Sequence, residues 1–139
     1  MRKKIVFLSY QHRYLTDRVY NALAEQLMEF DLIYLDSDLD YPSYNENKNS
    51  DKKYLESGGF RVKYVTPNVP QFFSRLGYLN SLIKLIALRR WRFKLKKVVA
   101  KLNPDVIVCI SDRAHNYKVI KGSNCVDCPF VIVQHGQIK

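Results

Sequence analysis

Four short apolar runs, separated by segments of helical or polar character, are the feature that most limits the fold of this chain. The runs are KIVFLSY at Lys4–Tyr10, DLIYLD at Asp31–Asp36, DVIVCI at Asp105–Ile110 and FVIV at Phe130–Val133. They show no helical period, and continuous apolar runs of this length are typical of strands that are buried on both faces of a parallel sheet. An alternating run at Arg61–Thr66 adds a fifth expected strand.

Helical patterns occupy much of the sequence between these runs. A helix is expected after the first run, with Thr16 as its N-cap and an apolar stripe that ends at Phe30. The longest pattern, Phe72–Leu102, predicts one or two consecutive helices with Gly77 as a joint. A shorter helix is expected at Ala114–Lys121, closed by a glycine C-cap.

The alternation of strands and helices predicts an α/β fold. We expect a Rossmann-like, doubly wound parallel sheet of about five strands in the order 3-2-1-4-5, flanked by helices of which one is long and basic. The 139 residues suit one domain over 1–139. Residues 37–59 are rich in Asp, Asn, Ser, Tyr and Lys, and are expected to form a long polar surface loop.

Polar clusters follow three of the expected strands, where open α/β sheets bind their ligands. His135 is the sharpest catalytic candidate, because it lies between a strand end and a glycine and an imidazole exchanges protons near neutral pH. An isolated histidine is more often a capping or packing residue, but His12, after the neighbouring first strand, favours a site. The candidate substrate-binding residues are Gln11, His12, Arg13, Asp112, Arg113, Gln134 and Gly136.

Two familiar kinds of site are not supported by the sequence. The turn SYQHRYLTDR after the first strand has no glycine, which argues against a bound dinucleotide. Cys125 and Cys128 form a lone C-x-x-C without a second pair of ligands, and Pro129 follows them where a redox motif would begin a helix. No cofactor and no metal are therefore expected.

Charge is unevenly distributed along the chain. The net charge is +10, and the segment Ser57–Pro104 contains eleven Lys or Arg residues and no acid. A basic helix that also carries apolar and aromatic residues is typical of peripheral binding to anionic membranes. Nucleic-acid binding uses similar residues, but no recognised motif accompanies them, and a plain solvated face is the third interpretation. The candidate membrane-binding residues are Arg89, Arg90, Trp91, Arg92, Lys94, Lys96 and Lys97.

The beginning of the chain and its cysteines favour a cytoplasmic location. The apolar run after Met1–Lys4 ends within six residues, which is too short for a signal peptide. Three cysteines are an odd number and are not spaced as a disulfide framework. Together with the basic helix, these features predict a cytoplasmic protein that lies peripherally at the inner face of the membrane.

The strand motifs resemble those of a known enzyme class. KIVFLSY, then LNPDVIVCISD and CPFVIVQHG, each separated by a helix, are similar to the N-terminal half of two-domain GT-B glycosyltransferases. The likeness is to bacterial enzymes of capsule and surface-polysaccharide biosynthesis, in which a PDVIV strand is followed by a helix and a P-hydrophobic-QHG strand. Pro104–Val108 and Pro129–Gly136 match that pattern, whereas Ser9–Arg13 replaces the usual glycine-rich first loop.

The resemblance implies a function for the chain. It would be the acceptor-side domain of an enzyme that transfers a sugar from a nucleotide sugar to a saccharide or lipid-linked saccharide. The donor would bind a C-terminal domain outside this sequence, and the present chain alone would be inactive. His135 would act as a base or would position the acceptor. A sugar-nucleotide epimerase of the same architecture, and a stand-alone flavodoxin-like binding or regulatory module, remain open as alternatives.

Overall fold

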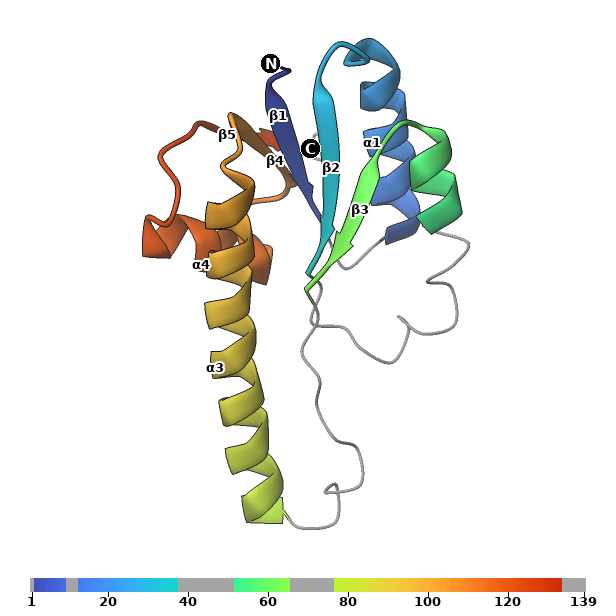
Figure 1. Ribbon diagram of the computed structural model, residues 1–139. Helices are drawn as coiled ribbons and strands as arrows, with labels where there is room; N and C mark the ends of the chain where they lie inside the picture. Colours follow the sequence, from blue (N-terminus) through green and yellow to red (C-terminus); the bar gives the residue numbers. More distant parts are fainter. Residues whose placement is uncertain (1, 10–12, 38–51, 66–76, 134–139) are drawn as a thin grey trace, which may run out of the picture.

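The fold is built around a five-stranded parallel sheet (Figure 1). The computed structural model describes residues 2–9, 13–37, 52–65 and 77–133. The strands are β1 (Lys4–Leu8), β2 (Asp31–Asp36), β3 (Arg61–Tyr64), β4 (Val106–Ile110) and β5 (Phe130–Val133). Their order is β3-β2-β1-β4-β5, and all four pairings are parallel. The predicted α/β class and strand order are therefore confirmed.

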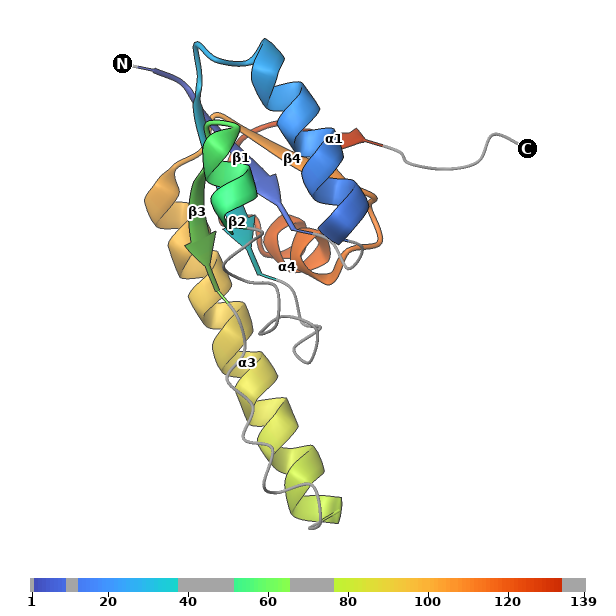
Figure 2. The same ribbon diagram turned by 90° about the vertical axis from the view of Figure 1, so that its right-hand side faces the viewer.

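Helices cover both faces of this sheet. On one face lie α1 (Arg13–Gln26) and a short helix over residues 52–57. On the other lie α3 (Gly77–Leu102) and α4 (His115–Ser123). Figures 1 and 2 show these two layers, and they also show the first half of α3 extending well past the ends of the strands.

The layer beneath α1 is rich in aromatic rings. Phe7 of β1 contacts Tyr20 and Phe60 edge to face, with ring centroids 4.9 and 5.0 Å apart. Tyr34 of β2 adds similar contacts to Tyr20 and Phe60 at 6.0 and 6.2 Å. Edge-to-face pairs contribute beyond their buried area, so these four rings hold α1 and the start of β3 on the sheet.

The layer beneath α3 and α4 is largely aliphatic, and it includes the aromatic residues Trp91, Tyr117 and Phe130. Leu95 and Val99 of α3 are fully buried against the strands, and Trp91 is only 3% exposed. The indole Nε1 of Trp91 donates a hydrogen bond to the carbonyl oxygen of Val65 at 2.9 Å. The buried core residues of α3 among the described side chains therefore all lie in its second half.

Several predicted boundaries differ from those observed. β1 ends at Leu8, and the first helix begins at Arg13, so Thr16 lies inside α1 and is not its N-cap. From Gly77 to Leu102 the expected Phe72–Leu102 pattern forms one continuous helix, α3, because good helix formers follow one another without a break. Residues 72–76 lie outside the described residues, so the expected joint at Gly77 stays a prediction.

Two further predictions need correction. Residues 52–57 are helical, although 37–59 was predicted to be a loop throughout, because buried Leu55 anchors this turn against the sheet. Residues 38–51 lie outside the described residues. α4 is closed by Asn124 in the left-handed region (φ 51°), which asparagine tolerates, whereas Gly122 lies within the helix.

Candidate functional site

The point where the strand order reverses lies between β1 and β4. The helix after β1 packs on one face of the sheet, and the helix after β4 packs on the other. In doubly wound sheets, such a switch point opens a place for ligands beyond the carboxyl ends of the strands. The residues that end β1, β2 and β4 are therefore the ones to inspect for a site.

A buried polar network lies at these strand ends. The Ser9 hydroxyl, directly after β1, accepts a hydrogen bond from the backbone amide of Ser37 at 2.9 Å. Asn116 of α4 donates from Nδ2 to the Ser9 carbonyl and to the Ser37 hydroxyl, both at 2.9 Å. Its Oδ1 accepts from the backbone amide of Tyr117 at 2.8 Å. Asn116 is 3% exposed, and it thus joins α4 to the ends of β1 and β2 in a site that excludes water.

A tyrosine bridges the two central strands from the opposite face. The hydroxyl of buried Tyr20 in α1 donates to the Leu8 carbonyl at 2.8 Å and accepts from the Ile110 amide at 3.1 Å. These are backbone groups at the carboxyl ends of β1 and β4, where the two strands separate. Tyr20 and Asn116 together make the base of the switch point rigid.

The turn after β4 presents charged side chains. Ser111 has a φ of 80°, an uncommon value for a residue with a side chain, and its amide donates to the Val133 carbonyl at 3.2 Å. Its hydroxyl accepts from the Arg113 amide at 3.2 Å. Asp112 and Arg113 are exposed on this turn, at the end of β4 where the sequence predicts them.

The remaining predicted site residues are only partly placed. Arg13 is the first residue of α1, and its backbone alone is described. The others lie outside the described residues and stay predictions: Gln11, His12, Gln134, His135 and Gly136. β5 ends at Val133, directly before Gln134, as the sequence predicts.

Sequence reasoning missed the polar network beneath the site. Ser37 was assigned to the polar loop, and Asn116 was treated only as part of a short helix. A signal was present, because both Ser9 and Ser37 directly follow buried strands. Asn116 carried no comparable signal, since its partners are 107 and 79 residues away in the sequence.

The basic face of α3 is largely solvent-exposed, but the prediction for Trp91 is wrong. Trp91 was predicted to contact the membrane but is a core residue, because its indole ring packs between α3 and the sheet. The other candidates are exposed, except for half-buried Lys96: Arg89, Arg90, Arg92, Lys94 and Lys97. Exposed apolar side chains of α3 accompany them, of which Phe93 at 70% and Leu85 at 63% are more exposed than Leu82 and Ile86. Within the described parts of the chain, no helix is long and apolar enough to cross a bilayer.

The three cysteines differ in burial, and one thiol of the C-x-x-C pair has a shifted pKa. They form no disulfide, and Cys109 is buried whereas Cys125 and Cys128 are half-buried. Burial raises the pKa of the Cys128 thiol, and the negative charges of Asp105 and Asp127 raise it further. A raised pKa disfavours the thiolate, the form that attacks electrophiles or binds metals. Over the described ranges, no group of three or more His, Cys, Asp or Glu residues is placed to hold a metal ion.

The strand order and the helices on both faces of the sheet define a Rossmann-like α/β domain. No protein-family model matches the chain, and no curated protein matches it significantly. Among solved structures, the chain is similar to UGT73P12, a UDP-glycosyltransferase from Glycyrrhiza uralensis, complexed with glycyrrhetinic acid 3-O-monoglucuronide. The identity is 18% and the TM-score 0.53, and the match covers 99% of this chain but 29% of that protein.

A second solved structure shares the fold. It is the C-terminal domain (residues 78–226) of the PF1911 hydrogenase from Pyrococcus furiosus, with 15% identity and a TM-score of 0.54. That match covers 94% of this chain and 89% of the domain. At these identities the likenesses establish the fold alone, because one fold hosts many activities.

Proposed function

We propose that this chain is the N-terminal, acceptor-side domain of a GT-B-type glycosyltransferase that extends a surface polysaccharide. The observation that carries the proposal is that almost the whole chain overlays on a part of a glycosyltransferase that is 29% of that protein's length. The resemblance of the PDVIV and P-hydrophobic-QHG strands to capsule-type enzymes supports the same assignment independently. The nucleotide sugar would bind a second domain, and the saccharide or lipid-linked saccharide acceptor would bind this one.

The proposed chemistry is proton transfer from the acceptor. His135 takes the proton from an acceptor hydroxyl while that oxygen attacks the anomeric carbon of the donor sugar, and the nucleoside diphosphate leaves. Asp112 and Arg113, exposed at the end of β4, contribute to acceptor binding. The other acceptor-binding residues in this proposal are Gln11, His12, Arg13, Gln134 and Gly136. The buried network of Ser9, Ser37 and Asn116 supplies a rigid base for them.

The exposed face of α3 completes the proposal. Its cations and the apolar side chains of Leu85 and Phe93 suit a surface of anionic phospholipids. A peripheral position at the cytoplasmic face of the membrane would bring the acceptor-side domain close to a lipid-linked acceptor. No acidic residue occurs within α3 to oppose this contact.

The test is sugar incorporation by the protein in its native source. A strain that lacks the gene is complemented with the wild-type protein, with His135→Ala or with the control His115→Ala. Membranes from each strain are then supplied with radiolabelled nucleotide sugars, and the incorporated label is measured. His115 is exposed at the start of α4 and has no proposed role, so its variant should match wild type. Loss of a general base should lower incorporation by His135→Ala at least about 100-fold.

The outcomes separate the alternatives. Full incorporation by His135→Ala contradicts the assigned role of this histidine and favours a binding or regulatory module. Conversion of the nucleotide sugar without any acceptor identifies an epimerase. The intact mass of the native protein, measured in parallel, should exceed twice the 16.4 kDa of this chain, since the proposal requires a donor-binding domain. A native product that ends at Lys139 would contradict it.

A further inference from the structure

A groove lined by four cations lies on the α3 side of the sheet, apart from the polar network at the switch point. It has a volume of about 490 Å³ and runs between β3 and the last turns of α3. Lys4, Arg61, Lys63 and Lys101 line it, and Val65 and Leu102 add apolar surface. Among the residues that the structure describes, no acidic side chain lines this groove.

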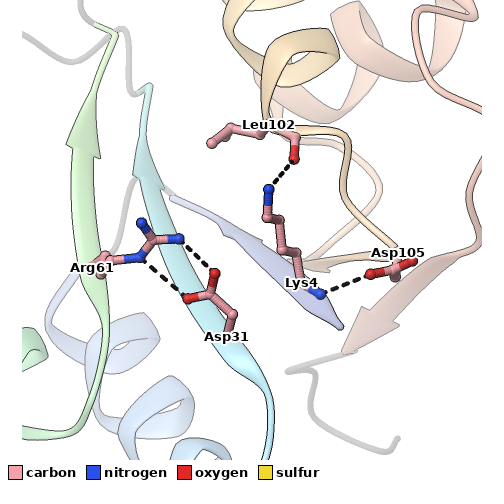
Figure 3. Close-up of polar contacts among 5 residues, drawn as sticks. All are labelled: Lys4, Asp31, Arg61, Leu102 and Asp105. Atoms are coloured by element: carbon pink, nitrogen blue, oxygen red, sulfur yellow. Dashed lines mark hydrogen bonds and ion pairs between the residues drawn. The ribbon is translucent and has the colours of Figure 1, made fainter. Parts of the chain in front are cut away.

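Two of these cations are held in place by the fold. Arg61 forms a bidentate ion pair with Asp31, in which Nε donates to Oδ1 at 3.2 Å and Nη2 donates to Oδ2 at 2.6 Å. The Lys4 ammonium donates to the Leu102 carbonyl at the end of α3, at 3.3 Å. Figure 3 shows the Arg61 side chain extending from β3 over β2 to Asp31, and Lys4 reaching from β1 to Leu102. The two side chains are thereby fixed before any ligand arrives.

These contacts leave most of the hydrogen-bond donors unused. A guanidinium has five N–H groups and an ammonium three, so Arg61 retains three donors and Lys4 two. Lys63 and Lys101 have no ionic partner among the residues that the structure describes. Two carboxylates lie nearby, but Asp31 is held by Arg61, and Asp105 accepts from the backbone amide of Lys4 at 2.8 Å. The groove therefore has a surplus of positive charge.

We infer that this groove binds a ligand that carries a dianionic phosphate group. Several cations around one groove favour a group with more than one negative charge and several acceptor oxygens. The fork of Arg61 suits phosphate oxygens, and the apolar surface of Val65 and Leu102 accommodates the less polar body of the ligand. The inference does not depend on glycosyl transfer, because the groove shares no residue with the proposed acceptor site.

The experiment measures binding of inorganic pyrophosphate by isothermal titration calorimetry at about 0.15 M salt, where nonspecific surface attraction is screened. The full chain is compared with the double variant Lys63→Gln/Lys101→Gln and with the control Lys53→Gln/Lys118→Gln. All four lysines are exposed, and both variants lose two charges, so any effect of net charge alone is equal in the two. Arg61 and Lys4 are not replaced, because their contacts with Asp31 and Leu102 are part of the folded structure.

We expect saturable binding by the wild-type chain. The dissociation constant should rise about tenfold or more in the groove variant, and less than about twofold in the control, because only the first loses charge-assisted hydrogen bonds to the ligand.

Phosphatidylcholine vesicles with and without phosphatidate form a second arm of the experiment. Pyrophosphate binding that depends on Lys63 and Lys101 assigns a soluble phosphate ligand. Dependence seen only with phosphatidate vesicles assigns a lipid headgroup. Equal weakening in both double variants, or no binding of either probe, would overturn the inference.

Discussion

Asn116 is the residue with the largest structural role at the switch point. Its amide group satisfies the Ser9 carbonyl and the Ser37 hydroxyl, which come from different strand ends and are both buried. An unsatisfied buried acceptor costs more than a formed hydrogen bond contributes, so this side chain should be difficult to replace. The network thus connects an asparagine on α4 to the geometry of the candidate site.

Replacement of Asn116 by Ala should lower the free energy of unfolding by about 1–3 kcal/mol, because buried acceptors lose their donor. The measurement is urea unfolding followed by circular dichroism. Lys118→Ala on the same helix is exposed and should change the free energy by less than about 0.5 kcal/mol. If Asn116→Ala is as stable as this control, the network does not organise the switch point.

Cys128 should make stability depend on pH in the alkaline range. Burial and then Asp105 and Asp127 raise its pKa above the ordinary value, so at pH values between the unfolded and folded pKa the unfolded chain has lost the proton and the folded chain has kept it. The free energy of unfolding must therefore fall as pH rises through this window.

The expected result is a steeper loss of stability above pH 9.0 in the wild-type chain than in Cys128→Ala. The measurement is urea unfolding from neutral to alkaline pH, and the difference between the two proteins removes the contributions of the other titrating groups. Identical pH profiles would show that the folded environment of Cys128 does not disfavour the thiolate.

At the scale of elements, α3 packs some of its apolar side chains against the sheet and exposes others to solvent. Its second half packs on the sheet through Trp91, Leu95 and Val99, whereas Leu85 and Phe93 remain exposed among cations. A periodic apolar stripe in the sequence does not distinguish a face that meets the core from one that meets another surface. Two properties of the structure make that distinction. The first is the face of the helix, since Phe93 is exposed although it lies between the buried Trp91 and Leu95 in the sequence. The second is the length of α3, because its first half extends past the strands and a core can form only where there is a sheet to pack against (Figure 1).

Removal of the exposed apolar side chains should weaken membrane binding without unfolding the chain. Leu85→Ser/Phe93→Ser is expected to lower partitioning onto phosphatidylcholine–phosphatidylserine vesicles about tenfold at low salt, because apolar burial and charge act together at such surfaces. Vesicle sedimentation is the measurement. The matched control is Met28→Ser/Val131→Ser, two exposed apolar residues outside α3. Absence of sedimentation by the wild-type chain, or equal loss in both variants, would contradict the membrane proposal.

At the scale of the whole molecule, the fold places polar chemistry at two separate positions. The switch point collects Ser9, Ser37 and Asn116 beneath the exposed turn of Asp112 and Arg113. The cationic groove lies between β3 and α3, and reaches Lys4 at the start of β1. Similarity to both a glycosyltransferase and a hydrogenase domain shows that this arrangement of strands does not specify a reaction. The residues at these two positions are therefore the ones that the proposed experiments address.

Local sequence patterns were enough to predict the strands and their order. β2 and β5 have the predicted bounds. Short apolar runs that end abruptly in polar residues are typical of strands in a parallel sheet, so the ends of each run mark the ends of the strand. The parallel order followed, since helical segments between strands permit parallel crossovers and few topologies. These are local patterns, readable within a window of some ten residues.

Which side chains contact one another depends on the three-dimensional fold. It buried Trp91 against Val65, joined Asn116 to Ser9 and Ser37, and brought Lys4 and Arg61 to one groove. Contacts between residues so distant in sequence depend on the faces that the helices cover and on strand register, and a one-residue shift of register would reverse every side chain. Composition and periodicity do not contain that information, which is why the polar network and the groove emerged only from the fold.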